Sequence, residues 1–334
     1  MPGRLGRVRC AALPAVPAVP AVPAVPAVPA VPAVPALLAL LAVLGAAAPA
    51  TAQQNLDTVR VTVQPVAGNV HVLFGSGGNM ALLAGDDGAV LVDDQYAPLS
   101  ERIRAAVATV SRTPVRFVIN THVHGDHTGG NENFGRTGAV IVAHDNVRTR
   151  LSAEQFNARL NRRTPAAPRG ALPIVSFSES VTFHLNGDSV RVVHLPPAHT
   201  DGDAYIHFTR ANVIHTGDVF NNGAYPLVDT YSGGSIDGYI TAIDAVLAVA
   251  DDRTRIIPGH GPVATRADLV EYRRVIATIR DRVLALVRAG KSLTEAAAAR
   301  PTAEFDDRWG KGFVTPDFLL DVVYNDLKAR HGSR

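Results

Sequence analysis

The chain has 334 residues, with 32 lysines and arginines against 30 aspartates and glutamates. Its first 52 residues hold three of the arginines and no acid, so the remaining 282 residues carry a net charge of −1, which argues against a nucleic-acid partner. The single cysteine, Cys10, lies in the same 52 residues, which excludes disulfides, zinc fingers, iron–sulfur clusters and cysteine nucleophiles from the remainder. All 12 histidines lie in that remainder, and histidine is the commonest metal ligand.

Residues 1–52 have the pattern of an export signal. A basic start leads into Ala-Val-Pro triplets at residues 14–35, whose prolines prevent a helix; a mis-assigned start codon is the alternative explanation of these triplets. The apolar stretch 36–48 is too short to span a bilayer comfortably, and an A-x-A cleavage motif follows at residues 50–52. We predict cleavage before Gln53 and a periplasmic or secreted protein without a stable membrane span, with an uncleaved anchor as the alternative.

Short β-rich runs alternate with helical patterns beyond residue 55, and no linker divides them. We predict strands at residues 59–63, 69–74, 80–84, 89–92, 116–119, 139–143, 181–185, 190–195, 204–208, 213–215 and 256–257. We predict helices at residues 98–111, 145–161, 236–250, 266–288 and 316–330, and a surface loop at 164–173. This order predicts an α/β fold in one domain, residues 53–334, in which two halves pack sheet to sheet with helices outside.

The strongest chemical signal is the run H-x-H-x-D-H at residues 122–127, directly after a predicted strand. His122 and His124 are two apart on extended backbone, so both imidazoles can point toward one metal ion. Asp126 and His127 follow a glycine that lets the chain turn, and they would face a second metal position. Imidazole and carboxylate ligands suit Zn²⁺, with Fe or Mn as alternatives.

Three further candidate ligands each follow a predicted strand. They are His199 after 190–195, Asp218 after 213–215, and His260 after 256–257. Taken singly, each reads as an ordinary polar loop or turn residue. Taken with the run at 122–127, they predict a site for two metal ions.

This set of residues resembles the metallo-β-lactamase-fold hydrolase superfamily over roughly residues 66–265. The resemblance implies a four-layer αββα sandwich with a dinuclear site, normally two Zn²⁺, at one edge of the two sheets. It implies these ligands: His122, His124 and His199 for the first metal, Asp126, His127 and His260 for the second, and Asp218 as the bridge.

Several other residues are candidates for the reaction. The resemblance assigns Asp93, or alternatively Asp94, to bracing the motif loop. Asp126 is a candidate proton shuttle as well as a ligand. Asn222 and Tyr225 follow Asp218 closely and are candidates for contacting substrate, although a tyrosine packed in the core is the more ordinary reading of Tyr225.

One departure from the family pattern bears on substrate. The best-known zinc β-lactamases have a cysteine where this chain has Asp218, whereas an aspartate there resembles glyoxalase-II-like thioesterases and lactonases. We therefore predict an exported dinuclear zinc hydrolase that opens a small carbonyl substrate with a metal-bridging hydroxide, β-lactamase-like and with antibiotic resistance as its consequence. A lactonase or thioesterase is the alternative, and a non-catalytic metal-binding protein is the alternative from another class.

Overall fold

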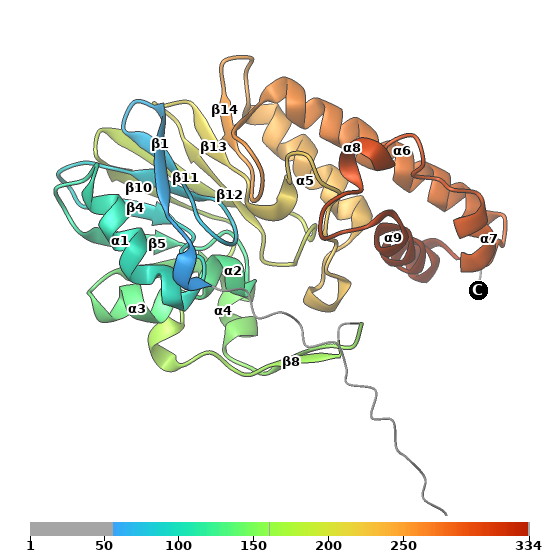
Figure 1. The fold of residues 1–334 in the computed structure, drawn as a ribbon, viewed down its shortest axis with the longest axis horizontal. Coiled ribbons are helices and arrows are strands. Elements are labelled where there is room, and N and C mark those ends of the chain that lie inside the picture. The colour runs from blue at the N-terminus through green and yellow to red at the C-terminus, as the bar shows by residue number, and fades with distance from the viewer. Residues whose placement is uncertain (1–55, 160, 333–334) are drawn as a thin grey trace, which may run out of the picture. The chain divides into compact units, whose positions relative to one another are not determined.

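The computed structural model describes residues 56–159 and 161–332, in which two β-sheets lie face to face (Figure 1). The first sheet has the strand order β1-β2-β3-β4-β5-β6-β9, and the second has the order β10-β11-β12-β13-β14-β15. The strands of the first sheet are β1 (Thr62–Ala67), β2 (Val70–Phe74), β3 (Met80–Leu83), β4 (Ala89–Val92), β5 (Val115–Ile119), β6 (Val140–His144) and β9 (Val175–Phe177). Those of the second are β10 (Ser180–Leu185), β11 (Asp188–His194), β12 (Ala204–Phe208), β13 (Val213–His215), β14 (Arg255–Ile257) and β15 (Ala264–Thr265).

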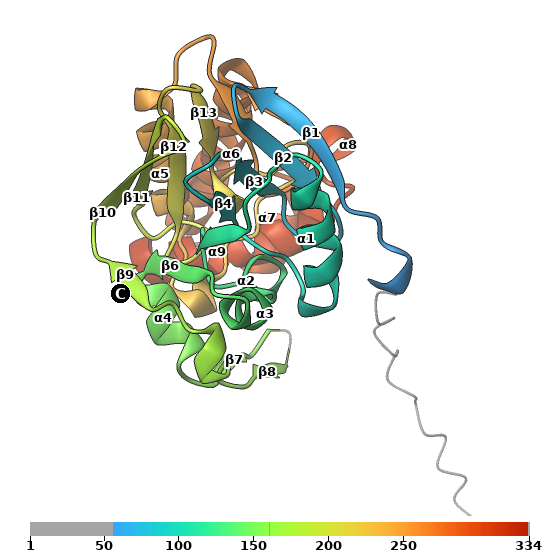
Figure 2. The same cartoon turned by 90° about the vertical axis from the view of Figure 1, so that its left-hand side faces the viewer.

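Helices cover the outer faces of both sheets. The α-helices are α1 (Ser100–Ala108), α2 (Gly125–Thr128), α3 (Asn131–Arg136), α4 (Asp145–Leu151), α5 (Ile236–Val249), α6 (Arg266–Arg288), α7 (Leu293–Ala298), α8 (Asp306–Trp309) and α9 (Pro316–His331). The short 3₁₀ helices are η1 (Leu56–Thr58), η2 (Ala97–Leu99), η3 (Arg169–Ala171), η4 (Gly217–Val219) and η5 (Thr230–Ser232). Helix α1 packs on the first sheet, α5 and α6 pack on the second (Figure 2), and α9 packs against α6 and α5. This is the predicted αββα arrangement, which the structure confirms.

Alternation of apolar side chains explains the layers. In β3, Ala81 and Leu83 are buried between the two sheets, whereas Met80 and Leu82 are buried against the layer that contains α1. Successive side chains of a strand point to opposite faces, so a strand that is apolar at every position is covered on both sides.

Parallel pairing brings the chemically important loops to one edge. Strands β4, β5 and β6 pair in parallel, as do β13 and β14, so their carboxyl ends lie at the same edge of each sheet. The loops that leave β5, β13 and β14 carry the run 122–127, Asp218 and His260 respectively. His199 enters the same edge from the connection between β11 and β12.

Two predicted elements are wrong. The predicted helix 145–161 ends at Leu151 as α4, and the chain then forms a separate hairpin of β7 (Gln155–Asn157) and β8 (Arg162–Thr164). The predicted strand 59–63 is shifted toward the C-terminus as β1, which pairs with β2 through Pro65 and has an irregular register there. An edge strand tolerates a proline, because its outer amides need no partner.

The predicted leader, residues 1–52, lies outside the described residues. Within residues 56–159 and 161–332, no helix has both the length and the apolar character needed to cross a bilayer.

Candidate metal centre

All seven predicted ligand residues meet at this sheet edge, in three overlapping groups whose potential ligand atoms lie within 4.8 Å of one another, and one of these groups joins His122, His127 and Asp218. The histidine end consists of His122, His124 and His199, and the aspartate end consists of Asp126, His127 and His260. Asp218 lies between them. Its Oδ1 is 3.2 Å from Nε2 of His127, and its Oδ2 is 3.4 Å from Nε2 of His260 and 3.7 Å from Nε2 of His199. Asp218 therefore contacts both ends, as a bridging residue must.

Each imidazole of the histidine end is oriented by a hydrogen bond at its outer nitrogen, the ring nitrogen that points away from the cluster. Nε2 of His124 donates to Oδ2 of Asp229 at 2.8 Å, and Nδ1 of His199 donates to the carbonyl of Leu227 at 2.6 Å. The other ring nitrogen of each histidine is then left as an unprotonated acceptor that faces the cluster. This is the arrangement that holds metal-binding histidines in one tautomer and one orientation.

Asp93 performs the same task for the motif loop. Its Oδ1 accepts from the amide of Thr121 at 2.8 Å, and its Oδ2 accepts from the Thr121 hydroxyl and from Nδ1 of His127, each at 2.7 Å. The Thr121 hydroxyl in turn accepts from Nδ1 of His122 at 2.9 Å. Asp94 contacts the amide of Gly130 instead, so Asp93 is the residue of the pair that braces the loop.

Inner ring nitrogens of different histidines are packed against one another, and this is the structural test for a bound metal. Nε2 of His199 lies 2.8 Å from Nδ1 of His124, and Nε2 of His127 lies 3.4 Å from Nε2 of His260. Two ring nitrogens this close need a cation or a proton between them. Nε2 of His122 is buried without a hydrogen-bond partner among the described residues. These side chains therefore fit a binuclear metal centre, in which each end would hold one ion.

Burial dominates the electrostatics of the histidine end. It lowers the pKa of His122 well below the usual range, and it lowers the pKa of His199 to about 4, with the neighbouring His124 acting in the same direction. Burial also lowers the pKa of His124, but the carboxylate of Asp229 outweighs it and raises that pKa. His122 and His199 are thus neutral at pH 7 and ready to bind a metal.

Charge dominates the aspartate end. The Asp218 carboxylate raises the pKa of His260 to about 10. Burial would lower the pKa of His127, but Asp218, Asp126 and Asp93 together raise it well above the usual range. Burial would likewise raise the pKa of Asp126, and the imidazoles of His127 and His260 lower it instead. Without a metal, this end is a network of protonated imidazoles and carboxylates.

Two glycines allow the close approach of these loops. A Cβ on Gly78 would clash with the ring of His127, and a Cβ on Gly259 would clash with Oδ1 of Asp218. Gly78 lies in the turn between β2 and β3, and its amide donates to the carbonyl of Asp126 at 3.1 Å. Side chains at either position would occupy the space of a ligand.

The two predicted substrate residues lie elsewhere in the network. The side chain of Asn222 donates to the carbonyl of Pro262 at 3.0 Å, and the backbone amide of Asn222 donates to the carbonyl of His260 at 2.9 Å. Asn222 therefore supports the loop that carries His260. Tyr225 is buried in the helical layer, and its hydroxyl donates to Oδ1 of Asp306 at 2.8 Å. Contact of either with substrate stays a prediction.

Sequence reasoning missed two residues of the site. Asp229 is 105 positions from its partner His124 and stands in no motif, and only the fold brings the two together. Tyr96 follows β4, and its ring would lie 3.2 Å from a Cβ on Gly77, beside the backbone of Asp126. Tyr96 is half-buried, and burial and the nearby Asp126 carboxylate both raise the pKa of its hydroxyl.

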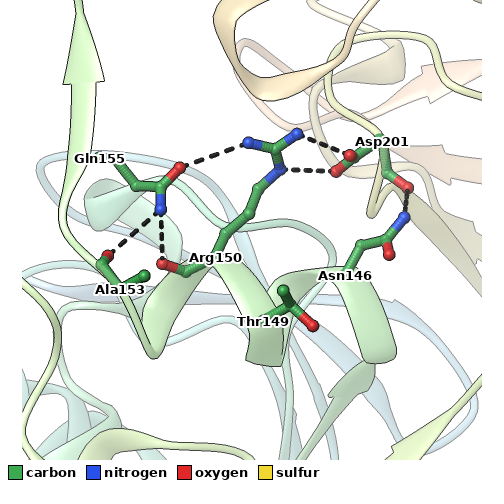
Figure 3. Close-up of a pocket in the computed structure, with 6 residues that line it drawn as sticks. All are labelled: Asn146, Thr149, Arg150, Ala153, Gln155 and Asp201. Atoms are coloured by element: carbon green, nitrogen blue, oxygen red, sulfur yellow. Dashed lines mark hydrogen bonds and ion pairs between the residues drawn. The ribbon is translucent and has the colours of Figure 1, made fainter.

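A pocket of about 260 Å³ lies next to the loop that carries Asp229 (Figure 3). It is lined by Asn146, Thr149, Arg150, Ala153, Gln155 and Asp201. The Arg150 guanidinium forms a two-pronged ion pair with Asp201 at 2.6 and 2.7 Å and also donates to the carbonyl of Tyr231 at 3.4 Å. The charges in this pocket are therefore already paired, and they support the Asp229 loop.

Comparisons with known proteins agree with this geometry. The model of the family described as "Metallo-beta-lactamase superfamily" matches residues 73–260. The alpha subunit of 2,4-dinitroanisole O-demethylase from Nocardioides sp. (strain JS1661) is 27% identical over 176 residues, which are 51% of this chain and 50% of that protein. The hydroxyacylglutathione hydrolase of Polaromonas sp. is 28% identical over 49% of this chain and 55% of that enzyme. The acyl-coenzyme A thioesterase MBLAC2 of Homo sapiens is 24% identical over 47% of this chain and 60% of that enzyme.

Solved structures show the same fold. A metallo-beta-lactamase from Pontibacter korlensis superposes with a TM-score of 0.55 at 19% identity, covering 65% of this chain and 99% of that one. The sec-alkylsulfatase Pisa1 from Pseudomonas sp. gives 0.62 at 19% identity, covering 82% of this chain and 51% of that one. The chain spans about half the length of the curated relatives it matches. Since the family model covers more than half of the chain and its characteristic ligands converge here, the chain belongs to the metallo-beta-lactamase superfamily.

Proposed function

We propose that this protein is an exported dinuclear metal-dependent hydrolase that cleaves an activated acyl compound, with a thioester as the leading substrate class. The observation that carries the proposal is Asp218, a carboxylate that contacts both ends of the metal centre. Two ions bridged in this way would lower the pKa of a shared water to near neutrality and polarise the carbonyl of the substrate. Zn²⁺ is the ion we expect, because the donors are imidazole and carboxylate.

The choice of thioester reverses the order that the sequence suggested. The curated relatives include hydroxyacylglutathione hydrolases and acyl-coenzyme A thioesterases, at 24–28% identity. The β-lactamases match through their fold, at 16–21% identity, which supports a shared architecture and nothing finer. A β-lactam is therefore the second candidate substrate. The best-known zinc β-lactamases have a cysteine at the position of Asp218, and this chain does not.

Asp126 is the residue that we assign to proton transfer. Its Oδ2 lies 3.3 Å from Nε2 of His260 and 3.6 Å from Nε2 of His127, and its side chain is 25% exposed, compared with 7% for Asp218. Asp126 is thus the carboxylate of the cluster that reaches the open side of the site. From there it can hold a proton and pass it to a departing thiolate or alkoxide.

Tyr96 is the residue that we assign to contact with substrate. Its ring lies beside Asp126, whereas the hydroxyl of Tyr225 already donates to Asp306. Burial raises the pKa of Tyr96, and the Asp126 carboxylate raises it further, so the phenol stays protonated and can donate to an oxyanion.

Three substrates tested in parallel would examine the proposal: an acyl thioester followed by thiol release, a lactone, and a chromogenic cephalosporin. The full chain would be used with two equivalents of Zn²⁺ and again after chelation. We expect metal-dependent thiol release with the highest kcat/KM of the three. Turnover of the cephalosporin alone would favour the second candidate, and no turnover with two metals bound would show that the hydrolase assignment is wrong.

Export rests on the pattern of residues 1–52 and has its own test. Mass spectrometry of the protein recovered from a cell envelope extract should find Gln53 as the new N-terminus. An intact N-terminus in the cytoplasmic fraction would contradict export and leave the hydrolase proposal untouched.

A further inference from the structure

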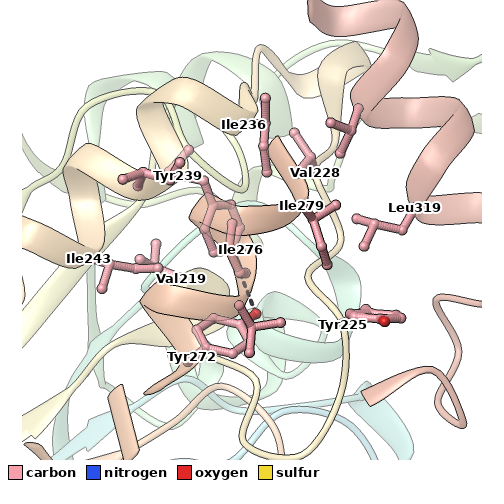
Figure 4. Packing of buried hydrophobic residues seen from close by; sticks show 14 of the residues in the cluster. Val219, Tyr225, Val228, Ile236, Tyr239, Ile243, Tyr272, Ile276, Ile279 and Leu319 are labelled. Carbon is pink, nitrogen blue, oxygen red and sulfur yellow. Dashed lines mark hydrogen bonds between the residues drawn. The ribbon is translucent and has the colours of Figure 1, made fainter. Parts of the chain in front are cut away.

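Two tyrosines of the helical layer reach the turn that carries Asp218. Tyr239 stands on α5 and Tyr272 on α6, and both side chains are fully buried. The hydroxyl of Tyr239 donates to the backbone carbonyl of Asp218. The two hydroxyl oxygens are 3.3 Å apart, and Figure 4 shows them meeting in the middle of the apolar cluster.

The direction of these hydrogen bonds is fixed by their ends. The carbonyl of Asp218 can only accept, so the Tyr239 hydroxyl donates to it, and the Tyr272 hydroxyl must then donate to the Tyr239 oxygen. Burial raises the pKa of Tyr272, so its phenol stays protonated and can donate. The chain of donors therefore runs from Tyr272 through Tyr239 to the carbonyl of Asp218.

The opposite side of the turn is held just as tightly. Gly217 has φ of +52°, and a Cβ there would meet the side chain of Thr121 at 2.7 Å. The amide of Gly259 donates to the carbonyls of Gly217 and Phe220 at 2.8 and 2.9 Å. The carbonyl of Asp218, which lies between these two, receives its hydrogen bond from a side chain of the helical layer instead.

We propose that Tyr239 and Tyr272 are a positioning pair that fixes the backbone at Asp218, so that its carboxylate can bind both metal ions at once. The proposal rests on the dinuclear centre proposed above. Tyr239 bonds the backbone of the turn, and Tyr272 bonds Tyr239. Since Asp218 is the residue shared by the two ends, a small rotation of its backbone would favour one metal at the expense of the other.

The test compares Tyr239→Phe with Tyr324→Phe. Tyr324 on α9 is a matched control, because it is 4% exposed and its hydroxyl also donates to a backbone carbonyl, that of Lys291 at 2.6 Å, outside the metal centre. Affinity for each metal equivalent would be measured by titration with Zn²⁺ against a chromogenic chelator. The absorption bands of the Co²⁺-substituted protein would report the ligand geometry directly.

We expect both variants to lose similar thermal stability. Only Tyr239→Phe should weaken the second metal equivalent, by about 10- to 100-fold, and shift the Co²⁺ bands, because residues that orient metal ligands have effects of this size. The proposal is overturned if Tyr239→Phe matches the parent in both measurements, or if Tyr324→Phe changes them equally.

Tyr272→Phe provides the second variant, should Tyr239→Phe fail to fold. It keeps the bond to Asp218 but removes its support, so we expect a smaller change in the same direction, and no change would overturn the proposal. A parent protein that binds two metals and hydrolyses nothing would defeat the proposed function alone, since the positioning pair is judged on metal binding. A parent that binds a single metal would defeat both.

Discussion

The two ends of the metal centre solve the same problem with opposite electrostatics. The histidine end relies on burial to keep His122 and His199 neutral, with outer nitrogens tied to neutral or charged acceptors. The aspartate end surrounds His127 and His260 with carboxylates that favour protonation. The difference indicates that the histidine end is prepared for a metal at neutral pH, whereas the aspartate end must first release protons.

Removing the bridge should have the largest effect, because Asp218 contacts both ends. Asp218→Asn keeps the size of the side chain but loses its charge, and we expect the second metal equivalent to bind at least about 100-fold more weakly, the upper limit seen for residues that only orient ligands. Metal content after dialysis and kcat at saturating Zn²⁺ would measure it. A variant that keeps two tightly bound ions would show that Asp218 is not a bridge.

The orienting carboxylates should separate the ends. Asp93→Asn disturbs the acceptor for His127 directly and that for His122 only through Thr121, so it should weaken the aspartate end more, whereas Asp229→Asn should weaken the histidine end through His124. Each substitution should weaken metal affinity by about 10- to 100-fold. In a titration with Zn²⁺, one variant should affect the first metal equivalent and the other variant the second. Identical titration curves for the two variants would contradict a division into two ends.

Proton release should distinguish the ends without mutation. A metal binds the unprotonated ring, and His260, with a pKa of about 10 in the metal-free protein, is protonated at pH 7. Affinity at the aspartate end should therefore rise with pH up to about 10, by roughly tenfold per unit for each proton released. Calorimetry in buffers of different ionisation enthalpy would count the protons, and an affinity that is constant between pH 6 and 9 would contradict the difference in charge.

The ligands were predictable because their order follows simple rules. The predicted strands end where polar residues begin, and parallel pairing places those ends at one edge of a sheet. The sequence alone therefore predicts that His122, Asp218 and His260 lie close together. Their conformations could not be predicted in this way. Asp93 adopts φ of +59°, a cost of order 1 kcal/mol that the surrounding hydrogen bonds outweigh and that no sequence pattern announces.

The residues around the ligands were harder to predict, since they act across long separations. Asp229 reads as an ordinary polar loop residue, and Tyr239 reads as one apolar position of a helix, until the fold places each against the site. The β7–β8 hairpin was misread as helix because residues 145–161 contain few breakers. Tertiary contacts of that hairpin, including the ion pair between Arg159 and Asp321 on α9, outweigh the local preference.

The smallest expected effect concerns the two tyrosines considered for substrate contact. Tyr225→Phe removes a hydrogen bond to Asp306, so it should lower the free energy of unfolding by about 1 kcal/mol while leaving KM and metal content unchanged. Tyr96→Phe removes a hydroxyl from a ring that lies beside Asp126, so it should leave stability unchanged and lower kcat. Chemical denaturation and steady-state kinetics of both variants would decide between them. If Tyr225→Phe alone impaired turnover, then the sequence-based choice of Tyr225 would be right, and the loop of residues 221–228 would have to move when substrate binds.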